Sequence, residues 1–509
     1  MTTMPRPLAA LVGLGIGIGA IALASRSHAP LSEFRREQGL VPAADPLENA
    51  PPLVAFTTVA LGGFRGIAAD ILWLRAVRLQ DHGQYIELVT LADWITKLQP
   101  RMPGVWVFQG WNLAFNISVM FERPEDRWRW VQHGIRLLRD EGLKYCPGQS
   151  KLYQELSWFF NFKIGEDMDD AHRLYKREWA RQMEHALGGP RPDFDALSRA
   201  PSSPDELERS PSARAWLDAM RGAGLDPYDP AWLDPRHGPP SWRERRTTDP
   251  GAAEWIAFLR ARALHTQYRL DPRAMAEVDA EYGPFDWRTP DAHAVYWAAQ
   301  GLPFARTDFQ RLQLERSRFQ AMAASFVRGR FHWTDTADGY ALAPNLDLLP
   351  AVRRAYEQTL ARAPDNESVV NAYRNFLRDA ILLCYSYNRQ DQARRLFDDY
   401  HTRFAGDGSP ADLESFVAGY YSAFIENLTP GQANAAVEAA LYQSLFWDAV
   451  GDPDQAAGYE RIALLIWQSW MGERTDPRLT ARVGLPPLGE LREQAARRVR
   501  DALSRSSNP

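Results

Sequence analysis

The sequence predicts an all-α protein, a right-handed stack of helical hairpins interrupted by one proline-rich insertion. Apolar side chains recur at three- and four-residue steps, which puts them on one stripe of a helix. Glycine or asparagine turns and closing prolines separate successive stripes, and alternation with a period of two is almost absent. At 509 residues the chain is also too long for a single ordinary core.

Residues 1–24 are expected to direct the chain to a membrane. Arg6 precedes an apolar run from Leu8 to Ala24, whose length lies between a signal-peptide core and a full membrane span. The segment is therefore either a cleaved signal peptide or a retained anchor. Residues 25–60 hold several prolines among polar residues, a composition typical of a linker and entry segment. The body is expected to be periplasmic or otherwise extracytoplasmic.

The N-terminal repeat block, residues 61–187, contains the clearest helical hairpin. One helix is expected near 67–81 and the next near 85–98, with Gly83 at the turn and Pro100 closing the pair. The apolar stripe of the second helix consists of Leu88, Leu91, Ala92, Ile95 and Leu98. Four more helices are expected before residue 188.

The helical pattern breaks at residues 188–250, where prolines recur too often for a continuous helix. This Pro-rich insertion is expected to keep a short helix near 212–221. Trp216, Trp232 and Trp242 are expected to attach it to the body of the protein.

Helical patterns resume in a central region, residues 251–345, and in a C-terminal repeat block, residues 346–485. Asp338-Gly339 is a hairpin-type turn and predicts two short strands at the end of the central region. Residues 486–509 are expected to form an exposed helix and tail. The helices expected in these regions are 251–269, 271–282, 290–300, 306–328, 349–363, 368–387, 390–404, 410–427, 431–449, 453–471 and 488–504.

The hairpins resemble tetratricopeptide repeats, a family of paired helices that form a superhelix. Gly83, Leu88, Ile95 and Pro100 match that family's pattern in spacing. The unit that begins at Gly451 matches without the closing proline, and the unit that begins at Asn388 matches more loosely. The resemblance implies a helical solenoid. The strings 63–70, 92–100 and 285–288 are also similar to those of an uncharacterised group of bacterial membrane-targeted proteins, a resemblance that implies no known activity.

Composition argues against several functional classes. The net charge of −5 gives no indication of a nucleic-acid partner. The only two cysteines, Cys146 and Cys384, lie in apolar surroundings without a second cysteine or histidine nearby, so two buried free thiols are expected. No HExxH, GxSxG or P-loop signature occurs. We therefore expect no catalytic residues, no metal site and no cofactor.

The best candidate contact site lies around a proline-bounded turn. Asp286, Arg288, Asp291 and His293 stand there beside Trp287. A carboxylate, an imidazole and a guanidinium together can bind an anionic ligand or transfer protons. Buried turns also use such residues to satisfy backbone groups.

A second polar cluster lies just before an expected helix. Asp167, Asp169, Asp170 and His172 offer oxygen and imidazole ligands for a divalent ion. Acidic residues at the start of a helix also stabilise its positive end without an ion, and this is the interpretation that we favour.

Tryptophan is unusually frequent, with 18 in the chain. Most lie at helical spacing among apolar residues, which favours packing between helices. Trp128 and Trp130 are two residues apart and cannot both face one core, so one of them is expected at a surface or partner contact.

The function expected from these patterns is a non-catalytic scaffold that binds other proteins, such as components of the bacterial cell envelope. Stacked hairpins expose long surfaces that suit a peptide or a partner domain. The alternative is an α/α-toroid enzyme or binding protein acting on cell-envelope glycans. Such a hydrolase needs two positioned acids, for which Asp286 and Asp291 are the first candidates.

Overall fold

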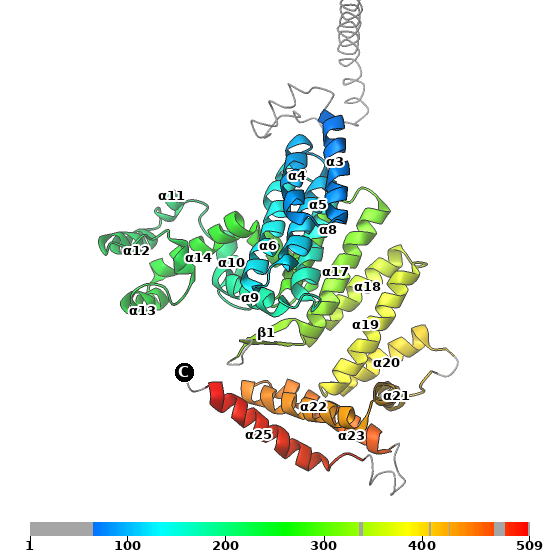
Figure 1. Cartoon of the computed structure of the whole chain (residues 1–509). Coiled ribbons are helices and arrows are strands. Elements are labelled where there is room, and N and C mark those ends of the chain that lie inside the picture. The colour runs from blue at the N-terminus through cyan, green and yellow to red at the C-terminus, as the bar shows by residue number, and fades with distance from the viewer. Residues whose placement is uncertain (1–64, 335–338, 407–408, 427, 473–483, 507–509) are drawn as a thin grey trace, which may run out of the picture.

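The computed structural model describes residues 65–334, 339–406, 409–426, 428–472 and 484–506. The expected targeting segment 1–24 and the linker 25–60 lie outside these residues. The all-α prediction is confirmed, because helices account for nearly all the regular structure described (Figure 1). Among the described helices, none combines the length and the apolar character needed to cross a bilayer.

The N-terminal block is a series of helices whose later members end in π-helical turns. Its elements are α3 (Arg65–Asp81), α4 (Tyr85–Leu98), α5 (Pro103–Trp111) with η2 (Asn112–Ile117) and η3 (Ser118–Met120), α6 (Pro124–Arg136) with η4 (Leu137–Gly142), α7 (Leu143–Tyr145), α8 (Ser150–Trp158) with η5 (Phe159–Gly165), and α9 (His172–Leu187).

Short helices and a β-hairpin make up the middle of the chain. The elements are α10 (Phe194–Arg199), α11 (Pro204–Leu207), α12 (Pro211–Gly222), η6 (Pro230–Leu233), α13 (Pro240–Thr248), α14 (Pro250–Ala263) with η7 (Leu264–Tyr268), α15 (Pro272–Tyr282), α16 (Pro290–Gly301), η8 (Leu302–Phe304), α17 (Asp308–Arg328), β1 (Arg330–Trp333), β2 (Tyr340–Ala343) and η9 (Leu346–Leu348).

The C-terminal block consists of longer helices. They are α18 (Leu349–Arg362), α19 (Glu367–Ser386), α20 (Gln390–Phe404), α21 (Leu413–Ile425), α22 (Pro430–Val450), α23 (Pro453–Gly472) and α25 (Leu488–Ser506).

The helix boundaries follow from local sequence. Asp271, Thr307 and Thr429 cap helix starts by accepting a hydrogen bond from a backbone N–H of the first turn. The predicted turns at Gly83 and Gly451 have φ angles of 68° and 86°, a left-handed conformation that glycine adopts without a steric penalty.

Most helices pack against a neighbour in chain order. In the N-terminal half α3 packs on α4, α4 on α5, α5 on α6 and α8, and α8 on α16. The chain of contacts continues from α16 through α17, α18, α19, α20 and α21, and then through α23 and α22 to α25. Figure 1 shows the first helices, α3 and α4, and the last, α22 to α25, at opposite ends of the molecule.

The insertion has a core of its own. Trp216 packs against Trp242 and Trp255, with ring centroids 5.1 and 5.7 Å apart, and Trp232 also packs against Trp255. The three tryptophans expected to attach the insertion to the body therefore pack chiefly on one another and on α14. This second core runs from Leu207 to Ala263, and α11 to α14 project to one side in Figure 1.

Three smaller expectations have clear outcomes. The short hairpin forms where it was predicted, as an antiparallel pair with Phe331 opposite Leu342. Cys146 and Cys384 are buried free thiols, as predicted. The C-terminal helix, expected to be exposed, packs on α22 and buries Leu491, because its apolar residues share one stripe.

Candidate functional site

Asp286 and Arg288, two residues of the predicted site, form a closed ion pair. The carboxylate of Asp286 accepts hydrogen bonds from Nε and Nη2 of Arg288 at 2.9 and 2.8 Å, and from the backbone N–H of Phe331 at 2.9 Å. Arg288 also donates to Glu184 of α9 at 2.9 Å. Burial acts to lower the pKa of Arg288, but the hydrogen bonds and charges of Asp286 and Glu184 raise it above the ordinary value. The pair joins the turn to β1 and α9.

Asp291 belongs to a second buried ion pair. Its Oδ2 accepts from Nε of Arg328 at 2.9 Å, and its Oδ1 accepts from the amide of Asn161 at 2.9 Å. Arg328 also donates to Glu166 at 3.0 Å. These contacts connect α16 to α17 and to η5, so the carboxylate serves packing between helices.

His293 lies fully buried in an aromatic cage. Its ring is 4.9 Å from Trp179, 5.6 Å from Phe160 and 5.7 Å from Trp287, between centroids. Nε2 lies 2.8 Å from the carbonyl of Trp287, which assigns the proton to Nε2, whereas Nδ1 has no partner. Burial lowers the pKa of His293 to about 4, so the ring is neutral near pH 7. Trp287 is itself buried and donates to Asp279 at 2.9 Å.

Of the two acidic residues of the predicted site, only Asp286 lines the cavity beside the turn. Asp286 and Arg288 line this cavity of about 320 Å³ with Arg191, Arg330 and other residues. A glycoside hydrolase needs two carboxylates on either side of one bond. The predicted residues are thus close in the fold, but each carboxylate is already bound to an arginine.

Trp128 and Trp130 divide as their spacing predicts. Trp128 is buried and stacks on Tyr175 with ring centroids 5.5 Å apart. Trp130 is half-buried on the outer side of α6 and stacks on Phe121 at 5.8 Å. Of the two, only Trp130 has a face available to a partner.

Asp169 lies at the centre of a buried charge cluster. Its carboxylate accepts hydrogen bonds from Arg127 at 2.7 Å, Lys163 at 2.6 Å and Tyr175 at 3.2 Å. Burial of a charge is costly unless it is paired, so the buried Lys163 and Arg127 both bond to Asp169. Arg127 also forms an ion pair with the exposed Asp170 at 2.5 Å.

Helix α9 begins at His172, and Oδ1 of Asp169 accepts a hydrogen bond at 2.9 Å from the N–H of Ala171, the residue directly before the helix. This contact fits the expected role of an acidic residue at the helix start.

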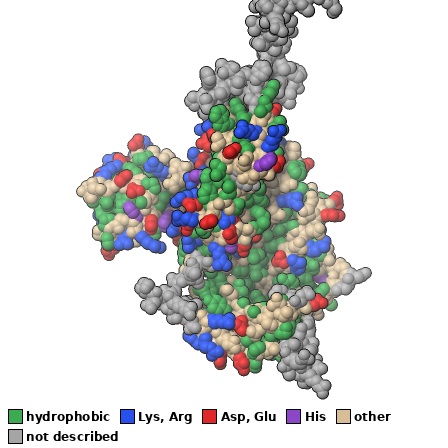
Figure 2. All heavy atoms as spheres, viewed as in Figure 1, with side chains coloured by type: hydrophobic (Ala, Val, Ile, Leu, Met, Phe, Trp, Pro, Cys, Tyr) green, Lys and Arg blue, Asp and Glu red, His purple; other side chains and the backbone are tan. Residues whose placement is uncertain are grey.

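An apolar surface covers the first hairpin. Of the sixteen large apolar side chains that are exposed among the described residues, six lie on α3 and α4. Figure 2 shows apolar side chains gathered at that end of the molecule. We call this the first-hairpin face, and its members, each at least 50% exposed, are Ile67, Ile71, Leu74, Val77, Ile86 and Trp94.

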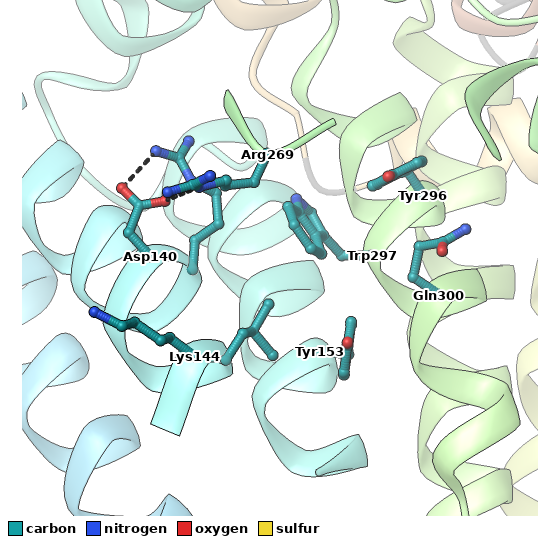
Figure 3. A pocket seen from close by; sticks show the side chains of 9 residues that line it. Asp140, Lys144, Tyr153, Arg269, Tyr296, Trp297 and Gln300 are labelled. Atoms are coloured by element: carbon teal, nitrogen blue, oxygen red, sulfur yellow. Dashed lines mark hydrogen bonds and ion pairs between the residues drawn. The ribbon is translucent and has the colours of Figure 1, made fainter. Parts of the chain in front are cut away.

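A polar cavity opens between η4, α8, η7 and α16, as Figure 3 shows. We call it the η4–α16 cavity; its volume is about 440 Å³. At one side, Arg139 forms a bidentate ion pair with Asp140: its Nε and Nη2 donate to the two carboxylate oxygens at 2.8 and 2.9 Å. Nε of Arg269 lies 3.6 Å from the same carboxylate. The lining residues are Arg139, Asp140, Leu143, Lys144, Tyr153, Arg269, Tyr296, Trp297 and Gln300.

Four polar side chains of this cavity have no hydrogen-bond partner among the described residues. They are Lys144, Tyr153, Trp297 and Gln300. Trp297 is only 3% exposed, and that small exposed part includes Nε1, whose N–H opens on the cavity. In Figure 3 its ring extends to the middle of the cavity, between Arg269 and Tyr153.

Irregular backbone surrounds the η4–α16 cavity. Asp140 belongs to a π-helical segment, a feature frequent at functional sites, and Arg269 directly follows a second one, η7. Arg269 has a φ of 53°, a left-handed conformation that is uncommon outside glycine. A second cavity of about 340 Å³ shares Arg139 and Asp140 and extends to Tyr268.

Sequence reasoning did not single out the residues of this cavity. Arg139, Lys144, Arg269 and Trp297 come from four separate segments and carry no motif. A π-helical turn has no reliable sequence signature, so the positions of η4 and η7 could not be predicted either.

Neither a metal centre nor a known relative identifies the site. Within the described ranges, no group of three or more His, Cys, Asp or Glu side chains is placed to hold a metal ion. Comparison with protein-family models, curated protein sequences and solved structures gives no match for this chain.

Proposed function

We propose that this protein is a non-catalytic, tetratricopeptide-like scaffold that binds a protein partner at the cell envelope. The observation that carries the proposal is the first-hairpin face. Exposed apolar residues on a protein surface are normally scattered singly. A concentration of large ones on two neighbouring helices is typical of an interaction surface. Burying such a face against a partner is favoured by roughly 25 cal/mol per Å² of apolar area.

The charges beside the face favour a protein over an anionic membrane surface. Between Ile67 and Leu98, three lysine or arginine side chains stand against four aspartate or glutamate side chains. Helices that lie on anionic lipid carry an excess of basic residues on the polar side. An apolar centre with charges of both signs around it is typical of a protein–protein interface.

The arrangement of helices supports a scaffold over the alternative toroid. Contacts between neighbours in chain order, with the first and last helices at opposite ends, suit an open stack. A toroid would bring its ends together and direct two carboxylates into one pocket. The arginine-bound state of Asp286 and Asp291 favours a structural role for both.

Site-specific photo-crosslinking in the native host tests the proposal. A photo-reactive residue replaces Leu74 in one full-length chain and Ile86 in another, and Arg243 of the insertion, also exposed, in a matched control. The expected result is one and the same polypeptide attached through both positions of the first-hairpin face and absent from the control.

A second variant keeps the test specific. Leu74→Glu places a charge in the centre of the face, and because the side chain is 67% exposed the fold should tolerate it. The partner captured through Ile86 should then be lost. The proposal is wrong if the crosslinks join only lipid, or only this chain's own apolar residues 53–61, which directly precede the hairpin.

A further inference from the structure

The η4–α16 cavity offers far more hydrogen-bond donors than acceptors. Lys144 and Trp297 can only donate, and the guanidinium of Arg269 adds further donors. Tyr153 and Gln300 can do either. Of these five side chains, Arg269 alone has a polar contact, a long one of 3.6 Å to Asp140.

The single acidic side chain of the cavity is already occupied. Asp140 accepts two hydrogen bonds from Arg139 and is shared with Arg269. One carboxylate therefore stands against three cationic side chains along the cavity wall. The third is the exposed Lys144, whose amino group lies 5.2 Å from the centre of the Tyr145 ring.

We propose that this cavity binds a small organic anion, a sugar-sized molecule that carries a phosphate or carboxylate group. The charged group would lie between Lys144 and Arg269, where ionised donors form the strongest hydrogen bonds. The body of the ligand would accept from Nε1–H of Trp297 and bond to Tyr153 and Gln300. The volume of about 440 Å³ lies in the range of small-molecule sites.

The indole N–H of Trp297 is the most informative feature of the site. The ring is 3% exposed, and its N–H opens on the cavity with no hydrogen-bond partner among the described residues. A ligand oxygen would satisfy it. Tyr153 points the same way, because burial raises the pKa of its hydroxyl and keeps it a neutral donor.

Calorimetric titration of the full chain, purified in a mild detergent at low ionic strength, tests the proposal. The probes are glucose 6-phosphate, glucuronate and inorganic phosphate, with uncharged glucose as the matched control. At least one of the two charged sugars should bind at one site and at least about tenfold more tightly than glucose, as expected for a charge-assisted contact. If only glucose 6-phosphate binds, phosphate is the recognised group. If only glucuronate binds, carboxylate is the recognised group.

Three variants place the binding in this cavity. Lys144→Gln and Arg269→Gln should each lower the affinity for the charged sugar about tenfold, because each removes an ionised donor. Trp297→Phe keeps the ring and removes only the N–H, and should weaken binding about threefold or more. Arg243→Gln, which removes an exposed arginine from the insertion, should leave the affinity unchanged.

The result that overturns the proposal is that neither charged sugar binds more tightly than glucose. Binding that survives both Lys144→Gln and Arg269→Gln would place the ligand elsewhere and also overturn it. The inference does not depend on the scaffold function, because crosslinking through the first-hairpin face and titration of this cavity have separate readouts.

Discussion

The buried carboxylate clusters and the η4–α16 cavity are two polar regions of the same helical body. They differ in whether their polar side chains have hydrogen-bond or ion-pair partners within the protein. Around Asp286, Asp291 and Asp169, each buried carboxylate is held by at least one cation. In the η4–α16 cavity, Lys144 and Trp297 have no hydrogen-bond acceptor among the described residues. Partnered charges hold helices together, and breaking them costs stability. Donors without partners are free for a ligand, and removing them should weaken binding while costing little stability.

The largest effect is expected where a paired charge loses its partner. Arg328→Met leaves the carboxylate of Asp291, 1% exposed, with only the amide of Asn161. Breaking a buried pair in this way should lower the free energy of unfolding by about 3 to 5 kcal/mol. Urea denaturation followed by circular dichroism measures the loss.

An exposed pair supplies the control for that experiment. Arg389 and Asp454 are 3.0 Å apart with more than half of each side chain exposed. Arg389→Met should change the free energy of unfolding by no more than about 1 kcal/mol. If the two arginine variants lose the same free energy of unfolding, then burial does not determine how much these ion pairs contribute to stability.

His293 should make the protein sensitive to acid. Burial lowers its pKa from 6.5 to about 4 in the folded state, so the unfolded chain binds the proton more readily between these values. Stability is therefore full above pH 6.5 and falls as the pH drops towards 4. By linkage this single group accounts for about 3 kcal/mol.

The slope of unfolding free energy against pH measures that effect. His293→Gln should flatten the slope between pH 4 and 6.5 even if it lowers stability throughout. His82→Gln, at an exposed histidine, serves as the matched control. An unchanged slope in His293→Gln would mean that this histidine takes up no proton on unfolding.

Asp169→Asn should have a smaller effect, about 2 kcal/mol, because the amide keeps the shape and some hydrogen bonds. Burial alone would raise the pKa of Asp169, but the hydrogen bond and charge of Lys163, with further help from Arg127, hold it below the ordinary value. The charge thus stabilises the fold above pH 4, and this contribution disappears as the pH falls through the lowered folded-state pKa. Denaturation of both proteins from pH 7 down to pH 2 should show a difference at pH 7 that shrinks as the pH falls below 4.

The sequence predicted the local structure better than the long-range contacts. The expected helix 306–328 is observed as α17 (Asp308–Arg328), because its apolar spacing and the capping residue Thr307 are local features. The contact of Asp291 with Asn161 joins residues 130 positions apart, and no local pattern indicates it. The independent core of the insertion was missed for the same reason, since pairing Trp216 with Trp255 depends on tertiary packing.

The smallest expected change in stability is at Trp297. Its Nε1–H has no partner among the described residues, so Trp297→Phe removes no hydrogen bond, and the phenyl ring keeps much of the contact with Tyr153, now 6.2 Å away between centroids. For comparison, Nε1 of Trp255, another buried tryptophan, donates to the carbonyl of Pro227 at 2.7 Å.

Trp255→Phe leaves that carbonyl unpaired and should cost about 1 to 3 kcal/mol more than Trp297→Phe, for which a loss near 1 kcal/mol from reduced packing is expected. Thermal unfolding of the two variants measures both losses, and the change in side-chain size is the same in each. Equal losses would show that the N–H of Trp297 has a structural partner after all, and would remove it from the donors available to a ligand. A small loss at Trp297 together with weaker binding of the charged sugar would separate the two polar regions by function, because one side chain would then affect binding without holding the fold.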